Sequence, residues 1–324
     1  MSDSVQLLGV SNAIVDVLAQ VSHEFIAELG CVPGSMNLIE ADQAQAIYDK
    51  MGPTTQRSGG SVANTIAAFA NLGGRAAYIG RVADDELGTV FDHDMNSLGV
   101  DMRRPPAAAQ AATARCYVMV TPDGQRTMHT YLGACLELNE SDVSEESVGV
   151  PQVVLFEGYL LDAPHGPALI EKAIRIAKDH GSEVALSLSD SFCVERHLET
   201  FRRLVNESVD IVIADDSEAL ALFATESLDE AIDAASALGN LFAITRAAEG
   251  SVIVRGSERI DQKADRVEKV IDSTGAGDAY AAGFLHAYAN DKPLRSCARL
   301  ASWCGAQAVQ QMGARFESEK LRDD

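Results

Sequence analysis

Basic residues are scarce in this chain. Its 324 residues include 26 Lys and Arg against 48 Asp and Glu, which gives a formal net charge of −22. Nucleic-acid surfaces need clustered Lys and Arg to neutralise phosphates, so we expect no nucleic-acid partner. Long apolar runs are missing too, since none approaches the ~20 residues that a membrane-spanning helix needs. The composition therefore also argues against a membrane partner.

Paired cysteines and a secretory leader are likewise missing. The six cysteines are scattered along the chain, with no Cys-x-x-Cys pair among them. This pattern favours reduced thiols over disulfides or a zinc site. Residues 1–18 show no basic segment followed by an apolar core and a small-residue cleavage site. Together these absences predict a cytoplasmic protein.

The familiar glycine-rich phosphate loops are also absent. The sequence has no G-x-x-x-x-G-K-[ST] segment, and it contains no Gly-Lys dipeptide at all. It also lacks G-x-G-x-x-G. These absences exclude a P-loop nucleotide site and disfavour both a dinucleotide-binding fold and a kinase of the protein-kinase type.

One segment does have the composition of an anion site. In the run 272–278, Gly275, Ala276 and Gly277 are small residues at the predicted start of an apolar helix. Their backbone N–H groups and the helix dipole favour a bound anion. Asp278 follows directly and is a candidate base, although an acid in a first helical turn also serves simply to stabilise the dipole. Asp272 is expected to orient this turn or to approach a cation.

The second half of the chain alternates short apolar runs with helix-like segments. Each apolar run ends on polar residues: Glu157 follows 153–156, Asp190 follows 184–188, Asp215 follows 211–214, and Arg246 follows 241–244 after Thr245. Strands this apolar are buried on both faces, which indicates a parallel sheet covered by helices. Ligands of such sheets bind beyond the carboxyl ends of the strands, so we expect these polar residues to share one rim.

The first half departs from this alternation. We expect a strand at 7–10, a helix at 61–72 with Ser61 as its N-cap, a strand at 77–79 and a helix at 84–98. Residues 37–40 and 115–131 look like strands without intervening helices, and the second segment predicts a hairpin around Pro122-Asp123-Gly124. No repeat or linker appears. The pattern therefore predicts a single domain, 1–324, with strands of a small sheet inserted at about 16–57 and 103–136, which serves as a lid or as a sheet edge or dimer contact.

Two motifs carry a family resemblance. Residues 272–285 are similar to the second signature of the ribokinase-like (PfkB) carbohydrate kinases, and Gly59-Gly60-Ser61-Val62-Ala63-Asn64 resembles the first motif of that family. The resemblance extends over essentially the whole chain. It implies a three-layer α/β/α fold with a central, mainly parallel sheet and a small β-sheet lid. It also implies an ATP-dependent transfer of the γ-phosphate to a hydroxyl group.

The resemblance also assigns roles to individual residues. It implies that Asp278 is the base that activates the acceptor hydroxyl and that the backbone of Gly275, Ala276 and Gly277 forms the anion hole. Read without the family, Asp16 at a strand end and Asn64 in a first helical turn are equally well explained as capping residues. The implied substrate-side residues are Asn12, Asp16, Gly60, Asn64 and Glu157.

Other residues are implied to meet the nucleotide and its metal. The family's Asn-x-x-Glu element reads Asp215-Asp216-Ser217-Glu218 here, so Asp215 replaces an asparagine and adds a negative charge. Glu218 is expected to support Mg²⁺ through water, with an acid-rich helix start as the alternative. A monovalent cation such as K⁺ is a further possible cofactor. The implied nucleotide-side residues are Asp215, Thr245, Arg246, Gly250 and Gly313, and 306–313 is expected to form the adenine wall or merely to pack a helix.

The sequence constrains the phosphate acceptor less than it constrains the fold or the reaction. Gly-Gly-Ser-x-x-Asn is closer to the motif of adenosine kinases than to that of ribokinases, which favours the 5′-hydroxyl of adenosine or a related nucleoside. A free sugar such as ribose, fructose or a sugar acid is the alternative, and a non-catalytic nucleotide- or sugar-binding sensor is a lesser one. A purine needs an apolar slot, whereas a free sugar needs more polar partners. Met36, Leu38, Tyr117 and Leu132 are candidates for that slot, and a homodimer through the lid is a further expectation.

Overall fold

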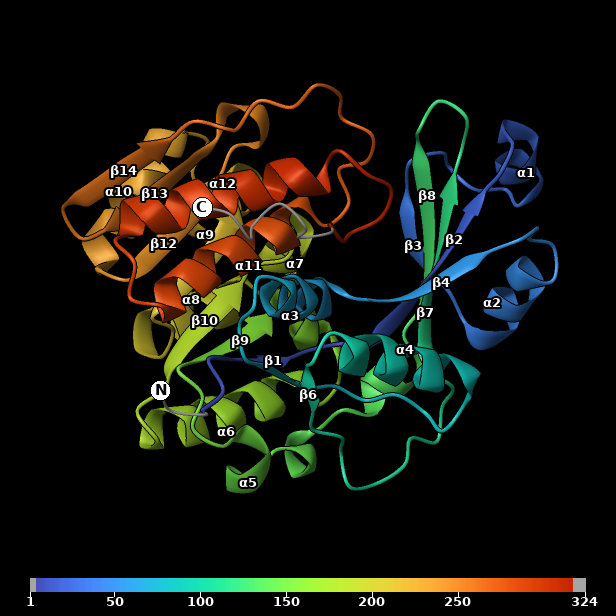
Figure 1. The fold of residues 1–324 in the computed structure, drawn as a ribbon, viewed down its shortest axis with the longest axis horizontal. Coiled ribbons are helices and arrows are strands. Elements are labelled where there is room, and N and C mark those ends of the chain that lie inside the picture. The colour runs from blue at the N-terminus through green and yellow to red at the C-terminus, as the bar shows by residue number, and fades with distance from the viewer. Residues whose placement is uncertain (1–3, 317–324) are drawn as a thin grey trace.

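The computed structural model describes residues 4–316 and contains two sheets (Figure 1). The larger sheet has nine strands in the order β14-β13-β12-β11-β10-β9-β1-β5-β6. Its strands are β1 (Leu7–Val10), β5 (Ala76–Ile79), β6 (Asp101–Met102), β9 (Val153–Glu157), β10 (Glu183–Ser187), β11 (Ile211–Asp215), β12 (Leu241–Thr245), β13 (Ser251–Arg255) and β14 (Glu258–Gln262). The pairing is parallel from β12 to β6 and antiparallel only at β13 and β14. The predicted α/β fold with a mainly parallel sheet is therefore confirmed.

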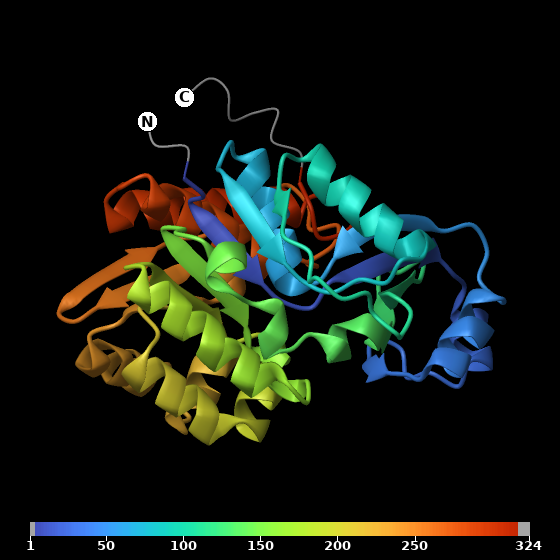
Figure 2. The ribbon, with the colours of Figure 1, turned by 90° about the horizontal axis from the view of Figure 1, so that it is seen from below.

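The side chains of successive strand residues pack alternately into two hydrophobic cores, one on each face of this sheet. In β9, Leu155 joins one core while Val154 and Phe156 join the other. Side chains alternate between faces along a strand, so a strand buried on both sides must be apolar throughout. Figure 2 shows the helices divided between the two faces. One group comprises α3 (Ser61–Asn71), α4 (Glu86–Ser97), α11 (Ala276–Ala289) and α12 (Leu294–Ala308); the other comprises α5 (Glu145–Val148), α6 (Gly166–Asp179), α7 (Ser191–Arg196), α8 (Leu198–Glu207), α9 (Asp216–Phe223) and α10 (Leu228–Leu238).

The second sheet projects from one end of the larger one (Figure 1). Its strand order is β3-β8-β7-β2-β4, formed by β2 (Ile14–Gln20), β3 (Met36–Leu38), β4 (Thr55–Gly59), β7 (Ala114–Val120) and β8 (Arg126–Tyr131). The antiparallel pairing of β7 with β8 confirms the predicted hairpin. We call these five strands the small sheet.

Two local expectations about the first half are wrong. The region 16–57 also contains the helices α1 (His23–Glu28) and α2 (Ala41–Tyr48), which are too short to show a clear helical period. Asp16 lies inside β2 and not at a strand end. Because β2 alternates, the side chains of Val15 and Val17 are buried, whereas those of Asp16 and Leu18 are partly exposed on the other face.

The start of α3 also differs from expectation. Gly60 occupies the N-cap position with φ of 94°, and Ser61 is the first helical residue, which frees its hydroxyl for a tertiary contact. A Cβ on Gly60 would lie 2.6 Å from the backbone oxygen of Asn12, so only glycine fits this close approach. Within residues 4–316, no helix is long and apolar enough to cross a membrane.

Candidate active site

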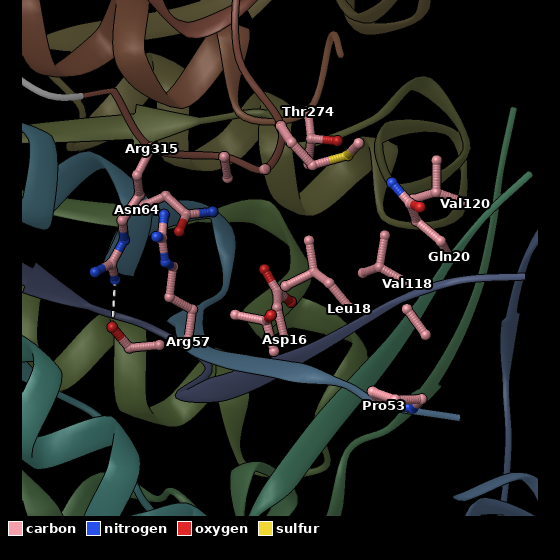
Figure 3. A pocket seen from close by; sticks show the side chains of 16 residues that line it. Asp16, Leu18, Gln20, Pro53, Arg57, Asn64, Val118, Val120, Thr274 and Arg315 are labelled. Atoms are coloured by element: carbon pink, nitrogen blue, oxygen red, sulfur yellow. Dashed lines mark hydrogen bonds between the residues drawn. The ribbon is translucent and has the colours of Figure 1, made fainter. Parts of the chain in front are cut away.

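Two cavities meet at the loop that precedes α11. The small-sheet cavity, of about 580 Å³, is drawn in Figure 3 and is lined by Asp16, Leu18, Ala19, Gln20, Pro53, Thr55, Arg57, Ser58, Asn64, Val118, Val120, Thr274, Met312, Gly313, Ala314 and Arg315. The glycine-loop cavity, of about 560 Å³, is lined by Thr245, Ala247, Ala248, Gly250, Ala264, Asp265, Arg266, Val267, Val270, Ser273, Ala276, Gly277, Tyr280, Ser302, Gly305, Ala306 and Val309. Thr274 faces the first cavity, and its neighbours in the loop face the second.

The loop and the first turn of α11 leave two backbone donors free. Gly275 is the N-cap, with a left-handed φ of 69°, and a Cβ there would lie 2.5 Å from the backbone oxygen of Ala314. The N–H of Ala276 donates to Ser273 O and that of Ala279 to Gly275 O. Within the described residues, the N–H groups of Gly277 and Asp278 between them have no acceptor. Free N–H groups at the positive end of a helix form a site that suits an anion.

Asp278, in the first turn of α11, is held by three side chains near the start of α3. Its Oδ1 accepts from Ser61 Oγ at 2.7 Å and its Oδ2 from Asn64 Nδ2 at 3.1 Å. Thr65 Oγ1 donates to the backbone oxygen of Asp278 at 3.2 Å. Burial raises the pKa of Asp278 to about 6, against the effect of these two side-chain hydrogen bonds. A carboxylate held in this way and ionised near neutral pH is chemically able to accept a proton.

Asp16 and two arginines form the polar end of the small-sheet cavity. Burial raises the pKa of Asp16 to about 7, the charge of Arg315 opposes this rise, and Asp278 adds to it. Arg315 Nη1 pairs with Asp94 at 2.9 Å. Arg57 lies opposite Asp16 on the adjacent strand β4, and its guanidinium group has no ion pair or hydrogen bond among the described residues. Neither arginine was predicted from the sequence, and Arg315 reaches the cavity only through packing of a distant segment.

Glu157 does not line either cavity, which corrects its predicted role as a direct substrate contact. Its side chain is 1% exposed. Its Oε1 accepts from the N–H of Asn12 at 3.0 Å and its Oε2 from the N–H of Val62 at 3.1 Å. Burial raises its pKa to about 7. Glu157 therefore fixes the two backbone segments that present Asn12 and the Gly60 turn, and its carboxylate is not available to a ligand.

Asn12 and Asn64 have unused amide oxygens. Each has a buried Oδ1 without a hydrogen-bond partner in the described residues. Asn64 lines the small-sheet cavity, whereas Asn12 is 4% exposed behind it. The structure thus brings Asp16, Asn64 and Asp278 together, with Gly60 and Asn12 forming the turn beneath them.

The predicted nucleotide-side residues divide between the cavities. Thr245 and Gly250 line the glycine-loop cavity together with Ala306. Arg246 follows β12 and lies near Glu249, 3.7 Å away, but it is not a lining residue. Gly313 lines the small-sheet cavity instead, because its N–H donates to Asp272 Oδ2 at 2.9 Å and so ties the segment to the loop.

Asp272 orients the loop, which is one of the two roles predicted for it. Its Oδ1 accepts from the backbone N–H of Thr274 at 2.8 Å. The same oxygen lies 3.1 Å from Nη1 of Arg126 on β8 of the small sheet, and Arg126 Nη2 donates to Ser273 Oγ at 3.1 Å. These contacts lower the pKa of Asp272 despite its burial. The small sheet is therefore linked directly to the loop, through an arginine that no sequence motif marks as part of the site.

The pair Asp215 and Glu218 caps α9. Asp215 Oδ1 accepts from the N–H of Glu218, and Glu218 Oε2 accepts from the N–H of Asp215. Burial, helped by the charge of Asp215, raises the pKa of Glu218 to about 8. No group of three metal-ligating side chains occurs within residues 4–316. A carboxyl group whose oxygen already accepts from the helix start in this way does not fit a direct Mg²⁺ ligand.

None of the four candidates for an apolar slot lines the small-sheet cavity. Tyr117 points to the opposite face of the small sheet, where it stacks on Tyr48. The cavity wall is aliphatic instead, with Leu18, Val118, Val120 and Met312. The correction follows from strand alternation, which places 118 and 120 on one face of β7 and 117 on the other.

The three-layer fold, the small sheet and two cavities that meet at a glycine-rich helix start define a kinase of ribokinase-like fold. The model of the pfkB family of carbohydrate kinases matches residues 30–321, and the chain belongs to that family. Kinases of this family phosphorylate hydroxyl groups of nucleosides or sugars. They use ATP, generally with Mg²⁺.

Individual relatives agree with this assignment. The adenosine kinase structure from Sinorhizobium meliloti is 46% identical with a TM-score of 0.89 and covers 96% of each chain. A probable sugar kinase from Rhizobium etli is 42% identical with a TM-score of 0.90, covering 97% of this chain and 96% of that one. The adenosine kinase of Saccharomyces cerevisiae is 25% identical, over 97% of this chain and 98% of its own length.

Proposed function

We propose that this chain transfers the γ-phosphate of ATP to the 5′-hydroxyl of a purine nucleoside. The observation that carries this proposal is the position of Asp278. It contacts Asn64 of the small-sheet cavity and directly follows Ala276 and Gly277, which line the glycine-loop cavity. A nucleoside in the first cavity and a nucleotide in the second would present hydroxyl and phosphate to the same carboxylate.

Each residue then has a defined task in the transfer. Asp278 accepts the proton of the hydroxyl as it attacks, and the pKa of about 6 leaves it ionised at neutral pH. ATP, when bound, supplies the phosphoryl group. The free N–H groups of Gly277 and Asp278 stabilise negative charge on that group, which is the main demand of phosphoryl transfer. Asp16 accepts hydrogen bonds from ribosyl hydroxyls, and Asn64 offers both a donor and an unused acceptor. Glu157 positions the turn that carries Gly60.

The wall of the small-sheet cavity favours a nucleoside over a free sugar. Beyond Asp16, the lining is aliphatic at Leu18, Val118 and Val120. A flat purine buries apolar area against such a wall, whereas a free sugar would leave it uncovered. One observation favours an alternative, which is a sugar acid. Arg57 is unpaired at the polar end and would suit a carboxylate.

The test is ATP consumption by the full chain with a panel of acceptors. We expect adenosine to stimulate ADP release more strongly than ribose, fructose or a sugar acid. Strong stimulation by a sugar acid alone would replace the nucleoside with the alternative acceptor. If no acceptor stimulated ADP release, the chain would instead be a nucleotide-binding protein.

The role of the cations also belongs to this proposal. We propose that Mg²⁺ enters with the nucleotide phosphates and that Glu218 acts on it only through water, because its carboxyl caps α9. Glu218→Gln should therefore weaken the dependence of kcat on Mg²⁺ modestly, and an unchanged dependence would remove this role. The same assay in K⁺ and in tetramethylammonium buffers checks whether a monovalent cation is needed.

We propose that the small sheet closes over the acceptor. We also propose that its free edge at β3 pairs two copies of the chain. The edge strand β3 exposes Met36 at 48% and Leu38 at 61%, and Val32 nearby is 69% exposed. Exposed apolar edges are sites of association. We expect the chain to elute at twice 34.5 kDa and Leu38→Asp to elute as a monomer. Leu238→Asp, at an exposed leucine on α10, is the matched control, and a monomeric unaltered chain would contradict the proposal.

A further inference from the structure

The face of the small sheet that lines the cavity is ordered in rows. On β2, Asp16, Leu18 and Gln20 all line the cavity, as alternation requires. Leu18 pairs with Val118 and Gln20 with Val120 on the neighbouring strand β7. Along β2 and β7, the sheet therefore presents a charged position, then an aliphatic pair, then a pair with a single amide. Figure 3 shows Leu18 and Val118 lying between Asp16 and Gln20.

The side chain of Gln20 is free to form hydrogen bonds with a ligand. It is exposed at the outer end of the cavity, and its side-chain amide has no hydrogen-bond partner within residues 4–316. It lies four positions along the strand from Asp16, a Cα distance of about 13 Å from the rise of ~3.3 Å per residue. With both side chains directed into the cavity, this spacing suits a nucleoside and is too long for a single pentose.

We infer that Gln20 recognises the substituent at C6 of a purine, an inference that rests on the proposed nucleoside kinase function. When Asp16 holds the ribosyl hydroxyls and the base lies on the aliphatic pair, the six-membered ring of the purine points away from the ribose. That direction leads to Gln20. No other lining residue beyond the aliphatic pair on β2 or β7 carries a side-chain amide, hydroxyl or charge.

The chemistry of an amide gives this contact a specific consequence. Glutamine carries one carbonyl acceptor and one NH₂ donor and can present either by rotation. A 6-amino group donates, whereas a 6-oxo group accepts. Gln20 therefore accommodates both adenosine and inosine, and a side chain that only accepts or only donates would separate them.

The test uses two opposite variants, Gln20→Glu and Gln20→Lys, and the ratio of kcat/KM for adenosine to that for inosine. The carboxylate should accept from the 6-amino group and repel the 6-oxo group, which raises the ratio about tenfold. The ammonium should donate to the 6-oxo group and lower the ratio by a similar factor. Gln56→Glu is the matched control, because Gln56 is on β4 and lines a cavity on the opposite face of the small sheet.

Opposite shifts in the two variants, with no shift in Gln56→Glu, would support the inference. Shifts in the same direction, or no shift, would overturn it. An unaltered chain that phosphorylates neither nucleoside would instead remove the proposed function itself, so the two failures are distinguishable.

Discussion

Replacing Asp278 with asparagine is expected to lower kcat by about 10²- to 10⁴-fold, the range that a general base contributes. The variant should fold normally. Asparagine at this position still accepts from Ser61 Oγ, and Asn64 can rotate its unpaired Oδ1 toward the new amide. The loss would therefore come from chemistry and not from disruption of the two helix starts. Steady-state and single-turnover kinetics with adenosine and ATP measure it.

One control variant and one pH profile accompany this measurement. Asp229→Asn makes the same change at an exposed first-turn position of α10 and should leave kcat unchanged. In the unaltered chain, kcat/KM should fall as the pH drops through about 6, because protonation removes the base. Turnover by Asp278→Asn at the unaltered rate would exclude the base role.

Truncating Glu157 to alanine should produce the largest loss of stability. The change leaves the N–H groups of Asn12 and Val62 buried without an acceptor. Each orphaned donor costs roughly 1–3 kcal/mol, so we expect a total of about 2–6 kcal/mol. KM for the nucleoside should rise as well, because the Gly60 turn loses its anchor. Thermal unfolding and steady-state kinetics measure the two effects.

Glu258→Ala is the control for this loss. Glu258 is an exposed glutamate on β14 of the same sheet, and its removal should leave Tm unchanged. If Glu157→Ala kept its Tm and raised only KM, Glu157 would contact the substrate directly after all, and the account of its position would be wrong.

Local patterns in the sequence were sufficient to predict the strands of the larger sheet and the start of α11. The runs that became β9 to β12 are almost entirely apolar, and only burial on both faces explains such strands. The start of α11 at Gly275 follows from glycine chemistry, which is equally local. Continuous apolar runs and glycine turns can both be recognised from a few consecutive residues.

The site itself depends on contacts between distant segments. Ser61 reads as an N-cap, and it serves Asp278 only because α3 packs on α11, which brings together residues 217 positions apart. Arg315 and Arg126 enter the site by the same kind of packing. For Glu157, the position at a strand end was predictable from the sequence. The two backbone N–H groups that donate to its carboxylate were not. Gly313 lies by the small-sheet cavity because Asp272 binds its N–H.

The identity of the phosphorylated product tests the proposed nucleoside kinase activity most directly. The full chain is incubated with adenosine, ATP and Mg²⁺, and the product is identified by ³¹P NMR and mass spectrometry, with 5′-deoxyadenosine as the comparison. We expect adenosine 5′-monophosphate in equal amount to ADP, and no product from 5′-deoxyadenosine. Phosphate on another hydroxyl, or phosphorylation of a sugar while adenosine is left untouched, would contradict the proposal.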